Sequence, residues 1–110
     1  MLAILEYIQA NYTSTSLGEV ARRFHYDPAY LGKRIRDYTG KNYRELVGSL
    51  RMNAACRLLR DSSLSVEKAA KASGFDNPAH FFKSFHRQYG MSPTAWRRNG
   101  GKKEKTEKDK

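Results

Sequence analysis

Two short windows of the sequence carry side chains suited to reading the edges of nucleic-acid bases. Their members are small, cationic or aromatic residues at helical spacing: Ala29, Gly32, Lys33 and Arg36 in the first window, and Pro78, Ala79, Phe82 and Lys83 in the second. A lysine can donate to O6 or N7 of guanine, and an apolar side chain can contact the methyl group of thymine. A glycine lets a helix backbone come close to its ligand, although Gly32 is equally well explained as a tolerated imperfection.

A second set of residues suits contacts with phosphate, which position a protein on DNA without reading its sequence. The set comprises serines at expected helix starts and basic side chains: Ser16, Arg34, Ser65, His86, Arg87 and Arg97, with Arg22, Arg23, Arg44 and Arg98 as further candidates. The charge of Arg36 also favours phosphate over bases. Each arginine fits a solvated surface about as well, and His86 fits a solvated helix end. Phe82 either contacts thymine methyl groups or packs under a neighbouring helix.

Residue patterns for catalysis or metal binding are missing from the sequence. No Ser/His/acid arrangement and no glycine-rich phosphate loop is present. Of the three histidines, only His80 and His86 share an expected helix, and their spacing of six does not suit a metal pair. Cys56, the single cysteine, is expected to serve packing. We therefore expect a protein that is not an enzyme and that needs no metal or cofactor.

The second window lies on a helix that local signals bound at both ends. Asn77 is a good N-cap, Pro78 fits the first helical position, and Gly90 suits the left-handed residue that often ends a helix. The stripe expected to face the core consists of Phe81, Phe85 and Tyr89. A shorter helix headed by Ser65 precedes this one, so the pair has the sequence form of a helix-turn-helix.

The same arrangement occurs earlier in the chain. Ser16 heads a short helix and has capping-box spacing with Glu19, and the next helix starts at Pro28 after Asp27 and ends at Gly40. Core positions are expected at Leu31, Ile35 and Tyr38, and at the matching turn residues Tyr26 and Phe75. The two copies are offset by 49 residues before the turn and by 50 after it. The chain therefore holds an internal repeat whose second copy has one extra turn residue.

A long helix is expected between the two copies, over residues 43–60. Its 18 residues span roughly 27 Å, close to the 34 Å of one DNA turn, although a plain core helix explains the pattern too. The predicted organisation is an N-terminal helix-turn-helix subdomain at 1–42, a linker helix at 43–60, a C-terminal helix-turn-helix subdomain at 61–98 and a disordered charged tail at 99–110. The fold class is all-α.

Charge and composition indicate a polyanionic partner. The formal net charge of the 110 residues is +10, and the last ten residues contribute only +2 of it. Release of counterions from neutralised phosphates drives binding of such a protein to nucleic acid. One cysteine excludes an internal disulfide, and no apolar run approaches the roughly 20 residues that span a bilayer. We expect a cytoplasmic protein without a membrane partner.

These residues resemble the DNA-binding domain of the AraC/XylS family of bacterial transcription regulators. The second copy carries most of the signature: Ala69, Ala70, Gly74, Phe75, Phe81, Phe85, Gly90, Ser92, Pro93 and, where the family usually has Tyr-Arg, Trp96-Arg97. The linker helix matches through Arg51, Ala55, Leu58 and Leu59. The chain departs from the family pattern at Gly32, in mid-helix, and at Phe82, where a small or polar residue is common.

The resemblance implies a seven-helix, homeodomain-like fold in which a linker helix joins two helix-turn-helix subdomains. It also implies a sequence-specific regulator that places two recognition helices in successive major grooves of an asymmetric double-stranded DNA site. RNA polymerase is the implied protein partner, and the bacterial nucleoid the implied location. The domain itself is expected to be monomeric. The 110 residues fit either a stand-alone short member or a fragment of a longer regulator, and dimerisation is expected only through a sensing domain, if there is one.

Two alternatives use the same residues. DNA-alkylation repair methyltransferases carry a similar DNA-binding module, but this sequence has no cysteine cluster to hold their zinc. A basic RNA-binding adaptor would need aromatic rings free to stack on bases, whereas most aromatic residues here lie in apolar stripes. Competition between duplex and single-stranded nucleic acid separates these readings.

Overall fold

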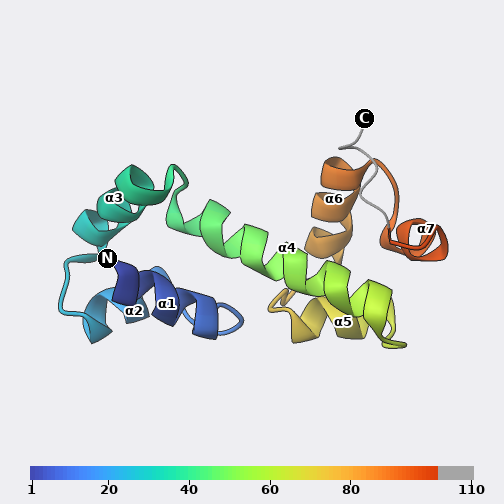
Figure 1. Ribbon diagram of the computed structural model, residues 1–110, viewed down its shortest axis with the longest axis horizontal. Helices are drawn as coiled ribbons and strands as arrows, with labels where there is room; N and C mark the ends of the chain where they lie inside the picture. The colour runs from blue at the N-terminus through green and yellow to red at the C-terminus, as the bar shows by residue number, and fades with distance from the viewer. Residues whose placement is uncertain (102–110) are drawn as a thin grey trace. The chain divides into compact units, whose positions relative to one another are not determined.

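The computed structural model describes residues 1–101, and every regular element in that range is an α-helix (Figure 1). The helices are α1 (Leu2–Asn11), α2 (Leu17–Arg23), α3 (Pro28–Thr39), α4 (Tyr43–Asp61), α5 (Val66–Ala72), α6 (Pro78–Tyr89) and α7 (Pro93–Arg98). The all-α class and the seven helices are confirmed, and the expected linker helix runs one residue further than predicted. Residues 102–110 of the predicted tail lie outside the described residues.

The chain divides into two compact units, and the boundary falls inside α4. The first unit comprises Met1–Arg51, and the second begins at Met52. The first core contains Ile4, Ile8, Val20, Ala21, Leu31, Ile35 and Val47. The second contains Met52, Ala55, Cys56, Leu59, Ala69, Ala70, Phe81, Phe85, Tyr89 and Trp96. The start of α4 thus completes one core and its remainder completes the other.

Aromatic packing dominates the second core. The predicted stripe of Phe81, Phe85 and Tyr89 is buried, and Trp96 of α7 is buried with it. The ring of Phe85 meets that of Trp96 edge-on, with 5.5 Å between centroids. Edge-to-face pairs of this kind add about 0.5–1.5 kcal/mol to the free energy of burial. Helix α6 is therefore fixed in position by the face opposite the one that could read DNA.

Helix starts and ends follow the sequence signals. Each predicted N-cap accepts a hydrogen bond from a backbone N–H: Ser16 from Glu19, Asp27 from Tyr30, Ser65 from Lys68, and Asn77 from Ala79 and His80. Such caps are worth about 1 kcal/mol each. The backbones of Gly40 and Gly90 are left-handed, with φ of 82° and 75°, as predicted for residues that close helices.

The capping box is complete at a different helix from the one predicted. The Glu19 carboxylate accepts from the Thr15 hydroxyl at 3.4 Å, while Ser16 caps its backbone N–H. At the start of α4 the exchange is reciprocal, since Asn42 Oδ1 accepts from Glu45 N–H at 2.8 Å and Glu45 Oε1 accepts from Asn42 N–H at 3.0 Å. This box fixes where α4 leaves the loop after α3.

The turns of the two helix-turn-helix motifs are related by the predicted repeat. His25 and Gly74, which are 49 residues apart, both have positive φ, at 62° and 105°. The next N–H in each copy bonds back to α2 or α5, from Tyr26 to the Ala21 carbonyl at 2.8 Å and from Phe75 to the Ala70 carbonyl at 3.0 Å. The extra residue of the second copy follows this bond. The internal repeat therefore holds in backbone geometry.

The core positions predicted for Tyr26 and Tyr38 were wrong. Tyr38 is 63% exposed because it lies in the last turn of α3, beyond the residues that cover the first core. Tyr26 is 36% exposed, and its ring stacks on that of Tyr30 with 5.9 Å between centroids. Its counterpart Phe75 meets the expectation better, since it packs edge-on against buried Phe81 at 4.9 Å.

In each unit an arginine binds backbone carbonyls at the end of another helix: Arg51 of α4 at the end of α1, and Arg97 of α7 at the end of α4. In the first unit, Arg51 Nε donates to the Tyr12 carbonyl at 2.9 Å. In the second, Arg97 Nε donates to the Leu59 carbonyl at 2.7 Å and its Nη2 to the Ser62 carbonyl at 3.0 Å. These carbonyls lie at or just beyond helix C-termini, where backbone acceptors lack intrahelical partners.

The described chain continues past the predicted end of the second subdomain. Gly101 N–H donates to the Trp96 carbonyl at 2.9 Å, and Gly101 is buried against the Arg60 and Trp96 side chains. Residues 99–101 were assigned to the tail, but they form a turn that closes α7. Gly100 and Gly101 both have positive φ, which the glycines permit.

Candidate nucleic-acid interface

Helix α3 presents its basic face because its opposite face is committed to the first core. Leu31 and Ile35 are fully buried, whereas Ala29, Lys33 and Arg36 are exposed. Gly32 is half-buried, since it faces α2: a Cβ added there would lie 3.5 Å from Leu17 Cδ2. The phosphate candidate Arg34 is also exposed on this helix.

Lys33 is held only weakly in the structure. Its Nζ lies 3.5 Å from Asp37 Oδ2, and the two side chains are 75% and 64% exposed. Exposed pairs at this spacing contribute about 0.3–0.5 kcal/mol. The lysine can therefore leave the aspartate for a base at small cost, which suits the predicted contact with guanine.

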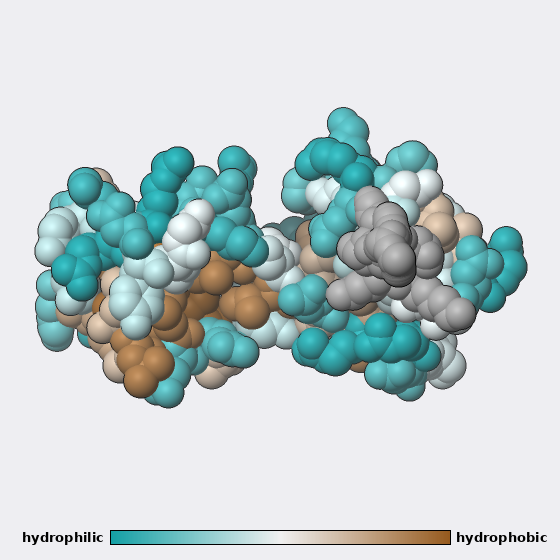
Figure 2. Space-filling model, turned by 45° about the horizontal axis from the view of Figure 1, so that its top comes forward, coloured by the Kyte–Doolittle hydropathy of each residue, from teal (hydrophilic) through white to brown (hydrophobic). Residues whose placement is uncertain are grey.

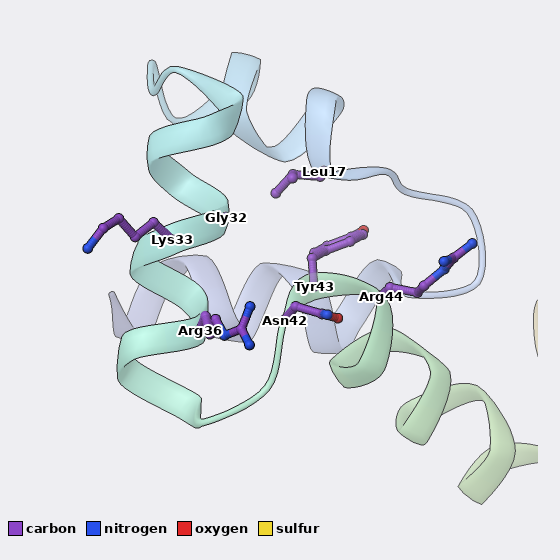
Figure 3. Close-up of a pocket in the computed structure, with 7 residues that line it drawn as sticks. All are labelled: Leu17, Gly32, Lys33, Arg36, Asn42, Tyr43 and Arg44. Carbon is purple, nitrogen blue, oxygen red and sulfur yellow. The ribbon is translucent and has the colours of Figure 1, made fainter.

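A pocket of about 450 Å³ lies between α3 and the starts of α2 and α4. We call it the α3 pocket; it is lined by Leu17, Gly32, Lys33, Arg36, Asn42, Tyr43 and Arg44. Figure 3 shows that Lys33 and Arg36 leave α3 on different sides: Lys33 points away from the pocket, and Arg36 points toward Asn42 and Tyr43. Lys33 and Arg36 were both predicted to read bases, but their side chains point in different directions.

Tyr43 forms the apolar middle of the pocket together with Leu17, whose side chain points toward α3 (Figure 3). The Tyr43 hydroxyl is buried and has no hydrogen-bond partner among residues 1–101. Burial raises the pKa of this hydroxyl, against the opposing charge of Arg51. The hydroxyl therefore stays protonated, and the ring presents an uncharged surface to the pocket.

Helix α6 has a bulkier outward face than α3. The predicted base readers Pro78, Ala79 and Lys83 are exposed, and so are the phosphate candidates His86 and Arg87. Phe82 is half-buried, with its ring edge-on to Phe81 at 5.9 Å between centroids. Part of the Phe82 ring therefore packs on the core and part remains free for a partner.

The remaining phosphate candidates have structural duties. The hydroxyls of Ser16 and Ser65 cap α2 and α5. Arg97 is half-buried, and two of its donors already bind carbonyl oxygens. For Arg97, a contact with phosphate would depend on the three N–H donors that remain, two on Nη1 and one on Nη2.

Both units carry net positive charge. Residues 1–51 hold eight Lys or Arg and five Asp or Glu, a balance of +3, and residues 52–101 hold eight and three, a balance of +5. Figure 2 shows hydrophilic side chains over much of the visible surface of each unit. The charge is therefore available to a polyanion on either unit.

Known proteins share the sequence pattern of this chain. A family model described as a helix-turn-helix domain matches residues 20–99, and the signature residues predicted from the sequence lie in that range. Relatives of this chain include the regulator GlxA of Rhizobium meliloti, which is 32% identical over 102 residues, 92% of this chain. The chain belongs to the AraC/XylS family.

Solved structures of similar proteins share the fold. One is the DNA-binding domain of AdpA in complex with a target DNA, with a TM-score of 0.82, 26% identity and coverage of 89% of each chain. Another is the C-terminal domain of AraT, a response regulator from Geobacillus stearothermophilus, with a TM-score of 0.82, 28% identity and coverage of 89% of this chain and 83% of that one. The seven-helix arrangement implied by the family resemblance is thereby confirmed.

The matched curated relatives of this AraC/XylS chain are transcription regulators, and they are considerably longer. The chain covers 32% of the length of GlxA and smaller shares of two other regulators. In residues 1–101, no helix combines the length and apolar character required to cross a membrane.

Sequence reasoning missed several residues of this AraC/XylS surface. The stacked pair of Tyr26 and Tyr30 was overlooked because Tyr26, a turn residue, was assigned to the core. The capping box at Asn42 and Glu45 has a recognisable spacing and could have been found. The α3 pocket had no signal in the sequence, because it brings together residues from three helices.

Proposed function

We propose that this chain is the DNA-binding part of a transcription regulator, and that α3 and α6 are its two recognition helices. Each would enter a major groove, with Ala29, Gly32, Lys33 and Arg36 on one helix and Pro78, Ala79, Phe82 and Lys83 on the other as base-reading candidates. Candidate phosphate contacts are Ser16, Arg34, Ser65, His86 and Arg87. Arg97, predicted with them, is proposed to act in the structure instead, through its two carbonyl partners. No catalytic step is proposed.

One observation supports the proposal most strongly: two capped helix-turn-helix motifs each leave the outer face of the second helix outside the core. In α3 that face is small and basic, and in α6 it is bulky and more apolar. Unlike faces favour unlike half-sites. We therefore expect an asymmetric target whose two segments lie about one helical turn apart, in successive major grooves.

Binding selection from random duplex DNA tests this function. The recovered sequences should contain two different preferred segments, and affinity should fall steeply as salt rises because phosphates are neutralised. Selection of a single segment, or of an inverted repeat, would contradict the asymmetric two-helix model. A folded sample that shows no affinity for duplex DNA in dilute salt would contradict the function itself.

Binding of single-stranded RNA is the second candidate, because the structure leaves three tyrosines exposed in the first unit: Tyr26, Tyr30 and Tyr38. Exposed rings can stack on unpaired bases. Competition between a selected duplex and single strands of the same sequence separates the two functions. Preference for the duplex favours recognition in the major groove.

The wider role follows from the family. Regulation of transcription would involve RNA polymerase, a partner that only the resemblance supports. A protein that binds bacterial DNA would be located in the cytoplasm, at the nucleoid. The domain would bind as a monomer, since two recognition helices already lie in one chain.

A further inference from the structure

We infer that the α3 pocket binds the sugar–phosphate backbone of DNA, with Arg36 and Arg44 on adjacent phosphates and the deoxyribose between them on Leu17 and Tyr43. The inference rests on the proposed function and names one of its subsites. Of the two roles expected for Arg36, it selects positioning of the strand over base reading. It gives the candidate phosphate contact Arg44 a defined place and adds Leu17 and Tyr43 to the interface.

The chemistry of the lining fits a backbone segment. Arg36 and Arg44 are exposed, and no hydrogen bond or ion pair among residues 1–101 occupies either guanidinium. In Figure 3 the two side chains lie on different sides of the Tyr43 ring. Guanidinium groups bind phosphate oxygens through paired N–H donors. Two cations flanking an apolar surface therefore match two phosphates flanking a sugar.

The floor of the pocket supports the same assignment. Leu17 and the Tyr43 ring are apolar, and the buried Tyr43 hydroxyl remains neutral because burial raises its pKa. Gly32 has no side chain to fill the space beside Leu17. A deoxyribose ring offers carbon-bound hydrogens to such a floor, whereas a base edge would find few polar partners there.

The acidic side chains beside the pocket residues are already engaged: Glu19 accepts from the Thr15 hydroxyl, Asp37 pairs with Lys33, and Glu45 belongs to a capping box. Glu45 follows Arg44 on α4, and its carboxylate accepts from the Asn42 N–H at 3.0 Å in the capping box. Its charge would oppose a phosphate placed directly over the helix start. The two arginines therefore define the phosphate positions at the sides of the pocket, and the helix end does not.

The test uses a duplex obtained by selection and the variants Arg36→Ala and Arg44→Ala. Each should weaken binding about 3- to 10-fold and reduce the slope of log K against log salt by about 1, with base preference unchanged. Arg57→Ala is the matched control: it removes the same charge from an exposed residue of α4 that is not a proposed contact. It should leave the slope unchanged.

Chemical probing of the DNA locates the contact. Ethylation interference with the unaltered protein should identify two adjacent phosphates in the segment read by α3. For each arginine variant, ethylation of one of these two phosphates should no longer affect binding. Hydroxyl-radical cleavage should be suppressed at the sugar between those phosphates. When one of these phosphates is replaced by methylphosphonate, the unaltered protein should lose as much affinity for the duplex as the matching variant loses for the natural duplex. This measurement keeps the test valid if a variant misfolds.

Three outcomes separate the inference from the function on which it rests. Binding of duplex DNA with unchanged salt slopes in both variants would overturn the pocket assignment alone. Altered base preference in Arg36→Ala, without loss of an interference position, would return Arg36 to base reading and also overturn it. Failure of the unaltered protein to bind any duplex would overturn both.

Discussion

Arg97 of α7 donates its Nε–H to the carbonyl oxygen of Leu59 in α4 across 2.7 Å. A second donor of the same guanidinium binds the Ser62 carbonyl at 3.0 Å. The charged side chain thus closes the end of α4 and ties the last helix of the second unit to it. Because two donors are occupied, Arg97 is better explained as a structural residue than as a phosphate contact.

Replacing Arg97 by alanine should lower the free energy of unfolding by about 1.5–3 kcal/mol, since hydrogen bonds from a charged donor to two carbonyls are lost. Chemical denaturation monitored at Trp96 measures the change. The neighbouring Arg98→Ala is the control, because Arg98 is exposed and its side chain makes no contact named above. Normal stability combined with a reduced salt slope of DNA binding would instead restore Arg97 as a phosphate contact.

Lys33→Ala and Lys83→Ala should each relax base preference in a different segment of the target. A lost lysine–guanine contact costs about 1–3 kcal/mol of discrimination. Selection from random duplexes with each variant gives the measurement, and the unaltered protein gives the reference. If both substitutions changed the same bases, the assignment of one groove to each helix would fail.

Gly32→Ala should raise stability and lower DNA affinity at the same time. Alanine in mid-helix is favoured over glycine by about 1 kcal/mol, and the added Cβ would sit at ordinary van der Waals distance from Leu17. The methyl group would also narrow the α3 pocket, so we expect affinity to fall by about threefold. Thermal melting and fluorescence anisotropy give the two quantities. Unchanged affinity would show that Gly32 is only a tolerated imperfection.

Alkaline pH should destabilise the second unit through Tyr89. Burial raises the pKa of its hydroxyl well above the usual value of 10, and a hydrogen bond with Cys56 adds to the effect. The unfolded chain loses this proton near pH 10 while the folded chain keeps it. The contribution of Tyr89 to stability is therefore complete below pH 10 and falls above it, by up to about 1.4 kcal/mol per pH unit.

Tyr89→Phe should flatten this fall, as measured by melting temperature between pH 8 and pH 11. Tyr38→Phe, at a 63% exposed position, is the matched control and should follow the unaltered protein. Identical profiles for all three proteins would mean that another group governs alkaline unfolding.

The sequence was most informative where a local signal decides the structure. Proline at the first helical position, the N-caps at Asp27 and Asn77, and the left-handed glycines at Gly40 and Gly90 all act within a few residues, and the helices begin and end as they indicate. The repeat added long-range information, because the turn of one copy predicts that of the other.

Properties that depend on distant residues could not be predicted in this way. Helical angle placed Tyr38 toward the core, but the core ends before the last turn of α3. Spacing alone could not show that Arg51 and Arg97 bind carbonyls 39 and 38 residues away in sequence. The same limit applies to the α3 pocket, which joins Arg36 of α3 to residues at the start of α4.

Helices α3 and α6 each occupy twelve residues between a capped proline and a left-handed glycine. Their boundaries are set from within, while their inward residues differ in size, from Leu31 and Ile35 to Phe81 and Phe85. Exposed outward residues, such as Arg36 and its counterpart His86, can therefore be exchanged without disturbing either hydrophobic interior, whereas Gly32 and Phe82 contact neighbouring side chains and cannot. Exposed positions on both helices can thus be substituted to obtain proteins with new binding specificities.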